Sequence, residues 1–481
     1  MRNGRKGAAW AAGAWRTAAA AGGGAARFMV SAAMDAVVVA AVMAAAVSPP
    51  ALAAQERDSI PGVTLGLIYE TAYQPALAVK PFTGRFGGAG LAPSVEAIIG
   101  RDLRNSDRFQ VMDSLPASLL GEGLDYTLWD RLGAVWLVTG QVEGAGDGFV
   151  AVVELHDVVY GEVKERGRFR IPDEADPDFR MAVHRISDRV VEWATGEPGM
   201  AASRIAFSMP NARGDKELYL IDSDGENLTR LTDFRSLTLS PAWSPDGTRL
   251  AYMSYKTGVP RIYEMDLVTG EEKRVPDARD GDHITPAYAP DGRTLAFAVV
   301  GGRQGGLFTY NVAEECCLTY LSGGRRHYDF SPTFSPDGRW LAFNTNRFGD
   351  AVPQIMVMPA EGGPAETLSP YQYGRGGYYT SPDWSPVGDL VAFHGRIRRG
   401  RYQILVANMK SRGRRVRQLT WEGNNEDPSW APDGRHLVFA GERNWGYGLM
   451  VVDVATGNIR LLLAGRRVSV PDWSPSLAPV R

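Results

Sequence analysis

Hydrophobic and polar residues alternate in short runs through residues 200–481, and Gly- and Pro-rich turns separate the runs. One period begins at Pro241–Trp243, passes a Pro-Asp-Gly turn, and continues with alternating runs at Leu250–Ser254 and Arg261–Asp266. Such alternation is typical of half-buried strands. Pro-Asp-Gly is typical of a tight turn in which Gly takes the positive φ. The pattern therefore predicts antiparallel units of short strands joined by tight turns.

The unit repeats along the chain. Segments with a shared Pro-x-aromatic core stand at Ser240–Gly247, Thr285–Gly292, Ser331–Gly338, Ser381–Gly388, Asp427–Gly434 and Val470–Pro475. Their aromatic residues are 45, 46, 50, 46 and 43 positions apart, which is the period of a four-stranded propeller blade. We expect each aromatic side chain to fill the wedge between neighbouring blades.

The ends of the repeat complement each other. Residues 204–231 contain three strand patterns without an inner strand, and Val470–Pro475 supplies an inner strand alone. Joined, they complete one blade, so the sequence predicts an all-β six-bladed propeller closed by the C-terminal strand.

Residues 55–199 show a mixed α/β pattern and predict a separate domain ahead of the propeller at 200–481. Apolar residues at helical spacing predict a helix over 93–105 and a final helix that Asp176 caps. A short helix is expected at 125–132. Strands are expected at 63–69, 76–82, 109–112, 134–142, 149–158 and 162–171.

Residues 1–54 read as a targeting segment. They carry five basic residues against Asp35, and an apolar run at 37–47 precedes the small-x-small sequence Ala51–Ala53. This order is typical of a cleaved signal peptide, although an uncleaved anchor stays open. We expect the mature chain to begin near Ala54 or Gln55, outside the cytoplasm.

The net charge of the chain becomes more negative once the predicted leader is removed. The whole chain has a net charge of −3 and the leader +4, so −3 − 4 leaves −7 for residues 55–481. A chain this acidic is a poor candidate for general nucleic-acid binding, which depends on Lys and Arg neutralising phosphates, so we expect no nucleic-acid partner. The two cysteines, Cys316 and Cys317, cannot build a disulfide scaffold. They read as a buried thiol beside an exposed one, with a vicinal disulfide as the alternative.

The loops that enter the inner strands carry the side chains most suited to binding. In the predicted topology they surround one mouth of the central channel, and binding residues concentrate on loops of rigid scaffolds. His283 and His327 precede inner strands of neighbouring blades. A metal site or a lyase site is therefore the sharpest enzymatic alternative to surface recognition. A periplasmic polysaccharide lyase or hydrolase, and a glycan-binding surface propeller, stay open as alternative functions.

Segments in both predicted domains are similar to those of a known family. The six propeller motifs are accompanied by Val79–Phe82, Arg101–Ser106 and Val138–Val142 in the α/β domain. With these segments, residues 60–481 resemble the TolB family of periplasmic propeller proteins. The repeat is shared with many periplasmic propellers, so the α/β segments are the discriminating part.

The resemblance implies a function. It implies a non-enzymatic, cofactor-free periplasmic adaptor of the Tol-Pal system that supports outer-membrane integrity and cell division, and that reaches the outer membrane through its partners. The lipoprotein Pal would dock at the propeller mouth. Candidate Pal-binding residues are His283, Thr285, His327, Tyr328, Asp329, Phe330, Tyr378, Tyr379, Asn424, Asn425 and Glu426. A TolA-like inner-membrane protein would engage the N-terminal strand, with candidates Val63, Leu65, Leu67 and Tyr69.

Overall fold

The computed structural model describes residues 59–60, 63–64, 73–112 and 123–479, apart from 147, 302–304, 325, 350–351, 371–376, 397–399 and 412–415. The predicted leader lies outside these residues, as do Leu65, Leu67 and Tyr69. Strands β1 (Ser59–Ile60) and β2 (Val63–Thr64) pair with each other. Within the described ranges, no helix combines the length and apolar character needed to cross a membrane.

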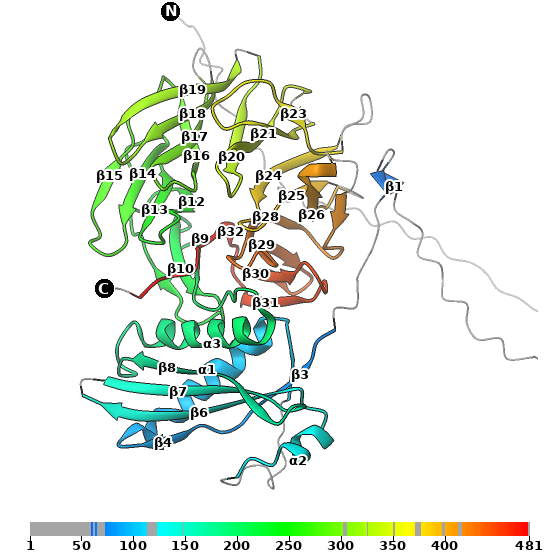
Figure 1. The fold of residues 1–481 in the computed structure, drawn as a ribbon. Helices are drawn as coiled ribbons and strands as arrows, with labels where there is room; N and C mark the ends of the chain where they lie inside the picture. The colour runs from blue at the N-terminus through cyan, green and yellow to red at the C-terminus, as the bar shows by residue number, and fades with distance from the viewer. Residues whose placement is uncertain are drawn as a thin grey trace, which may run out of the picture. The chain divides into compact units, whose positions relative to one another are not determined.

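An α/β region, residues 73–199, precedes the propeller. Its sheet has the order β5-β3-β6-β7-β8, and β4 also pairs with β6. Helices α1 and α3 cover one face of this sheet (Figure 1), where they share an apolar core with β3, β6 and β7. The elements are β3 Ala76–Val79, β4 Thr83–Arg85, η1 Gly88–Gly90, α1 Ala92–Asn105, β5 Gln110–Val111, α2 Tyr126–Arg131, β6 Trp136–Ala145, β7 Gly148–Asp157, β8 Glu162–Ile171 and α3 Phe179–Thr195.

Helix starts in this region depend on local side-chain bonds. The Asp125 side chain accepts the Leu128 N–H at 3.3 Å and caps α2, so the predicted short helix is present. The predicted Asp176 cap of α3 is wrong. The Asp176 carboxylate instead accepts the Asp178 N–H at 2.8 Å, and this turn delays the helix so that Asp178 becomes its N-cap residue.

The propeller has six four-stranded sheets, as predicted. Blades two to four contain β12 Thr238–Trp243, β13 Arg249–Ser254, β14 Arg261–Asp266, β15 Glu272–Arg274, β16 Asp282–Tyr288, β17 Thr294–Val300, β18 Gly305–Asn311, β19 Cys316–Gly324, β20 Asp329–Phe334, β21 Trp340–Thr345, β22 Gln354–Pro359 and β23 Glu366–Thr367. Blades five and six contain β24 Tyr378–Trp384, β25 Leu390–Arg396, β26 Tyr402–Asn408, β27 Val416–Gln418, β28 Asn425–Trp430, β29 His436–Arg443, β30 Gly446–Asp453 and β31 Ile459–Ala464. A 3-10 turn, η3 Met409–Ser411, follows β26.

Blade one closes the ring. It joins β9 (Arg204–Pro210), β10 (Lys216–Asp222) and β11 (Thr229–Arg230) to β32 (Ser469–Trp473) in the order β11-β10-β9-β32. Trp473 lies opposite Ile205 in the antiparallel β9–β32 pair. The predicted closure by the C-terminal strand is confirmed, and it leaves no inner strand of the ring unpaired.

The motif aromatics fill the wedges between blades, as expected. They are Trp243, Tyr288, Phe334, Trp384, Trp430 and Trp473, and all are buried. Each packs in an apolar cluster shared with the preceding blade; Trp430 of blade six, for example, packs with Ile404 of blade five. Burying a large aromatic side chain contributes about 1.5–3 kcal/mol. These shared clusters stabilise each blade against its neighbour.

The adjacent cysteines differ from the favoured expectation. Cys316 and Cys317 form a vicinal disulfide at the start of β19, on the outer edge of blade three. Cys316 is half-buried and Cys317 is exposed. Neither side chain is an inert buried thiol, and the alternative of a vicinal disulfide is the one found.

Candidate functional site

The candidate site is the channel mouth, formed by the first residues of the six inner strands and the loops that lead into them. A bulge interrupts every inner strand. At each bulge the residue before the motif proline has a φ between 44° and 52°. Proline lacks an N–H, so a bulge is a position where a strand accommodates it.

The bulge fixes which side chains reach the channel. In five of the inner strands and in the entry to the sixth, the second residue ahead of the positive-φ residue has a side chain buried in its blade. The residue directly ahead of the positive-φ residue has a half-exposed side chain. The buried set is Thr238, His283, Asp329, Tyr379, Asn425 and Val468, and the half-exposed set is Leu239, Ile284, Phe330, Thr380, Glu426 and Ser469. Four of the eleven predicted mouth residues therefore belong to the blade interiors.

His283 and Asp329 hold mouth loops in place. Nε2 of His283 accepts the Ala278 N–H at 3.0 Å, and its ring packs 5.6 Å from that of Phe297. Burial, aided by a nearby arginine, lowers the pKa of His283, so the ring is neutral near pH 7. Asp329 accepts two bonds from Arg347, at 2.9 and 3.2 Å.

Tyr379 and Asn425 play the same part in blades five and six. The Tyr379 ring meets Phe393 edge-on at 5.8 Å. The Asn425 side chain donates to Gln403 and accepts from Arg443 at 2.9 Å. The polar contacts of Asn425 are thus satisfied within the protein, as those of buried polar groups generally are.

The other predicted mouth residues retain accessible surface. Thr285, His327, Tyr328, Phe330, Tyr378, Asn424 and Glu426 are half-buried. Tyr378 packs edge-on against Tyr402, and the Arg396 guanidinium lies 5.0 Å from its ring centre. Burial, together with Asp427 and Glu442, raises the pKa of Glu426 to about 7. The mouth thus combines aromatic rings, hydroxyls and one carboxyl that titrates near neutrality.

Below the mouth, a cavity of about 200 Å³ runs between the inner strands. Asp383 and Asp472 line it, and each accepts the N–H of a motif tryptophan in the next blade at 2.7 Å. Burial raises the pKa of Asp383 to about 6. Burial and the neighbouring Asp383 raise that of Asp472 to about 8. These carboxylates tie blades together.

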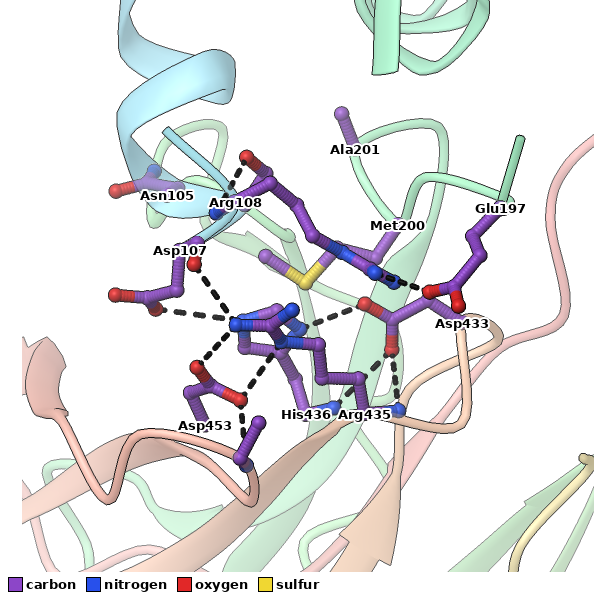
Figure 2. Close-up of polar contacts among 12 residues, drawn as sticks. Asn105, Asp107, Arg108, Glu197, Met200, Ala201, Asp433, Arg435, His436 and Asp453 are labelled. Carbon is purple, nitrogen blue, oxygen red and sulfur yellow. Dashed lines mark hydrogen bonds and ion pairs between the residues drawn. The ribbon is translucent and has the colours of Figure 1, made fainter. Parts of the chain in front are cut away.

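The end of the propeller opposite the mouth contacts the α/β region. Two polar clusters join them, and both include turn residues from this end. The blade-six cluster comprises Asp107, Asp433, Arg435, His436 and Asp453, which Figure 2 labels, together with Arg460. The blade-one cluster comprises Asp102, Arg180, His184, Arg204, Asp222 and Asp224.

Sequence reasoning missed both clusters. Asp107 and His436 are 329 positions apart, and no repeat or motif links them. One usable signal was present: Arg435 and His436 directly follow the Pro-Asp-Gly turn of blade six. That position puts two basic side chains at the end of the propeller where such turns lie.

Potential metal-ligand atoms gather in three groups among the described residues. One is Glu314, Cys316 and Cys317, where the disulfide engages both sulfurs. The other two belong to the clusters just defined, where guanidinium groups bind the carboxylates, so we assign them as ion-pair networks. The histidine pair of the metal or lyase hypothesis, His283 and His327, stands in none of the three.

Known proteins share both the α/β region and the propeller of this chain. Models of the TolB amino-terminal domain and the TolB beta propeller domain match residues 67–163 and 191–477. The Tol-Pal system protein TolB of Gluconobacter oxydans is 30% identical over 401 residues, which cover 81% of this chain and 84% of that protein. The Protein TolB homolog of Chlorobium chlorochromatii is 37% identical over 226 residues, 47% of this chain and 49% of that protein.

A solved structure agrees. The crystal structure of TolB from Acinetobacter baumannii matches with a TM-score of 0.71 and 25% identity, covering 84% of this chain and 97% of that one. The fold defines a six-bladed propeller protein in which an α/β region contacts one end of the ring and the other end carries the mouth. The chain belongs to the TolB family.

Proposed function

We propose that this chain is a non-enzymatic periplasmic adaptor of the Tol-Pal system, which binds the lipoprotein Pal at the propeller mouth. The observation that carries the proposal is membership of the TolB family through both the α/β region and the propeller. The relative from Gluconobacter oxydans bears the name of a Tol-Pal system protein. The arrangement of the propeller supports the choice of surface, because the α/β region contacts its other end.

The mouth has the composition of a protein-binding surface. Aromatic side chains and arginine are enriched where binding energy concentrates, and Tyr328, Phe330, Tyr378 and Arg396 supply them here. The four buried mouth residues support binding indirectly, since they fix the loops that present their neighbours. Preorganised loops lose less entropy on binding.

The test is a titration of the whole chain with the soluble domain of Pal. Joint replacement of His327, Tyr328 and Phe330 by Ala should weaken binding at least tenfold, since each alanine removes contact area at the mouth. The matched control replaces Val268 and Val387 by Ala. These two valines are 68% and 55% exposed and lie in turns at the end of the propeller opposite the mouth. Undiminished Pal binding by the triple variant, with an unchanged melting temperature, would contradict this interface.

We further propose that residues 63–69 bind a TolA-like protein by adding a strand to the edge of a sheet in that protein. Deleting 63–69 should abolish capture of the TolA-like protein and leave Pal binding intact. A deletion that leaves both interactions unchanged counts against this second contact.

A further inference from the structure

His436 lies between two parts of the chain that are distant in sequence. It begins β29, it has no exposed surface, and carboxylates face both of its ring nitrogens. Nδ1 is 2.7 Å from Oδ2 of Asp433, in the preceding turn of the propeller. Nε2 is 3.3 Å from Oδ2 of Asp107, which follows α1 in the α/β region. Figure 2 shows these residues converging from the two parts.

The chemistry of these two contacts specifies the protonation state. An ionised carboxylate only accepts hydrogen bonds, and a neutral imidazole carries a single N–H. Both contacts are therefore satisfied only when both nitrogens of His436 carry a proton. Asp433 stays ionised in this setting: burial alone would raise its pKa, but His436 and two backbone N–H groups hold it at about 2.

A charge count leads to the same state. The blade-six cluster has three carboxylates, on Asp107, Asp433 and Asp453, but two guanidinium groups. Arg435 pairs with Asp453 at 2.7 Å and donates to the Asp107 carbonyl at 2.8 Å. Arg460 donates to the Asn105 carbonyl at 3.1 Å and lies 3.8 Å from the Asp107 carboxylate. A protonated His436 brings the buried cluster to neutrality, which low-dielectric surroundings favour.

We propose that His436 acts as a proton-dependent bridge between the α/β region and blade six, holding them together as an imidazolium and releasing Asp107 when it loses its proton. The ligand of this site is a proton. The contact between the α/β region and blade six has two states, closed when His436 is protonated and open when it is neutral. The proposal does not depend on which partner binds the mouth.

The blade-one cluster has a similar charge composition but no histidine bridge, because Nε2 of His184 is buried without a hydrogen-bond partner. Nδ1 of the buried His184 is 2.8 Å from Oδ2 of Asp102 on α1, and His184 also faces Asp222 and Asp224 of the propeller. Two guanidinium groups, on Arg180 and Arg204, again face three carboxylates, and a protonated His184 would supply the missing positive charge. The other charged groups nearby are Asp188, which accepts the N–H groups of Ala201 and Ala202, and the Arg101–Glu226 pair. Arg101 also lies 3.3 Å from the Asp224 carboxylate, so the pair adds one charge of each sign and leaves the balance unchanged.

The two histidines respond to pH in the same direction. Burial alone would lower the pKa of His436 and of His184, but the adjacent carboxylates outweigh it, so both are raised above 6.5. A raised histidine pKa contributes stability that is complete below about pH 6.5 and is lost as the pH rises through the folded-state value. The contact should therefore weaken on the alkaline side.

Hydrogen exchange of the whole chain tests this. After correction for the intrinsic exchange rate, protection of the 100–112 segment should fall at least tenfold between pH 6 and pH 9. Asp107→Asn keeps the shape, and Asn tolerates the 51° φ of this position. It should lower protection at pH 6 about tenfold and reduce the pH dependence, because an opposite charge is removed from His436. His436→Gln should do the same.

The control is His156→Gln. His156 is equally buried, but it lies within the α/β sheet, bonded to Tyr126 and Thr139, and burial lowers its pKa. This variant should keep the pH response of the 100–112 segment. If His436→Gln fails to fold, Asp107→Asn carries the test alone.

Two results would overturn the proposal. One is protection of 100–112 that stays constant from pH 6 to pH 9 in the unaltered chain, or a pH response that Asp107→Asn leaves intact. The other is a metal effect. If EDTA removes the protection at pH 6, or added Zn²⁺ restores it at pH 9, a bound cation rather than a proton joins the two parts.

Discussion

The stabilising effect of Asp472, a buried carboxyl group in the channel, depends on whether it is protonated. Asp472 accepts the Trp243 N–H at 2.7 Å and the Ser429 hydroxyl at 3.5 Å, with Asp383 close enough to raise its pKa further. Its pKa of about 8 means that the folded protein favours the neutral acid. Ionising it above that pH places a charge among buried groups, which is unfavourable.

Asp472→Asn should therefore raise the free energy of unfolding by about 1–3 kcal/mol at pH 9. The amide oxygen can still accept the Trp243 backbone N–H, the amide NH₂ can donate to the Ser429 hydroxyl in place of the second oxygen, and the ionisable group is gone. The gain should vanish at pH 4, where the unaltered side chain is already neutral. Urea unfolding at both pH values measures it. Asp433→Asn is the opposite control: its pKa is about 2, so the amide should destabilise the protein at pH 9. A destabilised Asp472→Asn at pH 9 would contradict this account.

At the scale of elements, the inner strand explains both the success and the limits of sequence reasoning. Strand count, blade closure and the packing of the motif aromatics follow from the repeat. In each period the glycine marks a tight turn, the alternating residues mark strands, and the aromatic residue fills the wedge between blades. The direction of mouth side chains does not follow. A bulge shifts the alternation by one residue, and its exact place is set by pairing with the next strand. His283 and Asp329 thus fall on the blade side, beside Ile284 and Phe330 at the mouth.

Closure of the ring by β32 also makes a prediction at this scale. Trp473 is 5% exposed and its Nε1 donates to Ser203 Oγ at 2.7 Å. Trp473→Ala should lower the free energy of unfolding by about 3–5 kcal/mol, because it leaves a cavity between blades one and six. Trp340→Ala is the matched control, since Trp340 is 40% exposed and its loss should cost less than about 1 kcal/mol. Urea unfolding compares them, and equal losses would argue against Trp473 as a closing residue.

For the whole molecule, the contact between the α/β region and the propeller lay beyond the reach of the sequence. At blade six it joins residues more than 300 positions apart. Each of its polar side chains, taken alone in the sequence, looks like an ordinary solvent-exposed residue. Only the folded arrangement shows that each buried histidine supplies the charge that balances its cluster. The fold could be predicted because it repeats, and the contact could not because it occurs once.

The pH dependence of global stability follows from the sum of these groups. His436 and His184 have raised pKa values, so their contributions are lost as the pH rises above about 6.5. Asp472 has a pKa raised from 3.8 to about 8, so its contribution is lost progressively from about pH 4 to about pH 8. His156 and His283 have lowered pKa values, so theirs are lost as the pH falls below about 6.5. The melting temperature should therefore be highest between about pH 4, where the loss from Asp472 begins, and about pH 6.5, where the contributions of His156 and His283 are complete. A scan from pH 4 to pH 9.5 in one ionic strength measures it, and a maximum above pH 8 would contradict these assignments.

Blade one has a consequence for the order of events during synthesis. Ile205 and Trp473 pair across a separation of 473 − 205 = 268 residues, whereas each of the other five blades is built from consecutive strands. A chain that emerges from its N-terminal side can form those five blades one at a time, but the first blade waits for residue 473. Closing so long a loop is slow. The unfinished β9 edge therefore stays open to other strands, and to chaperones, until the last blade has emerged.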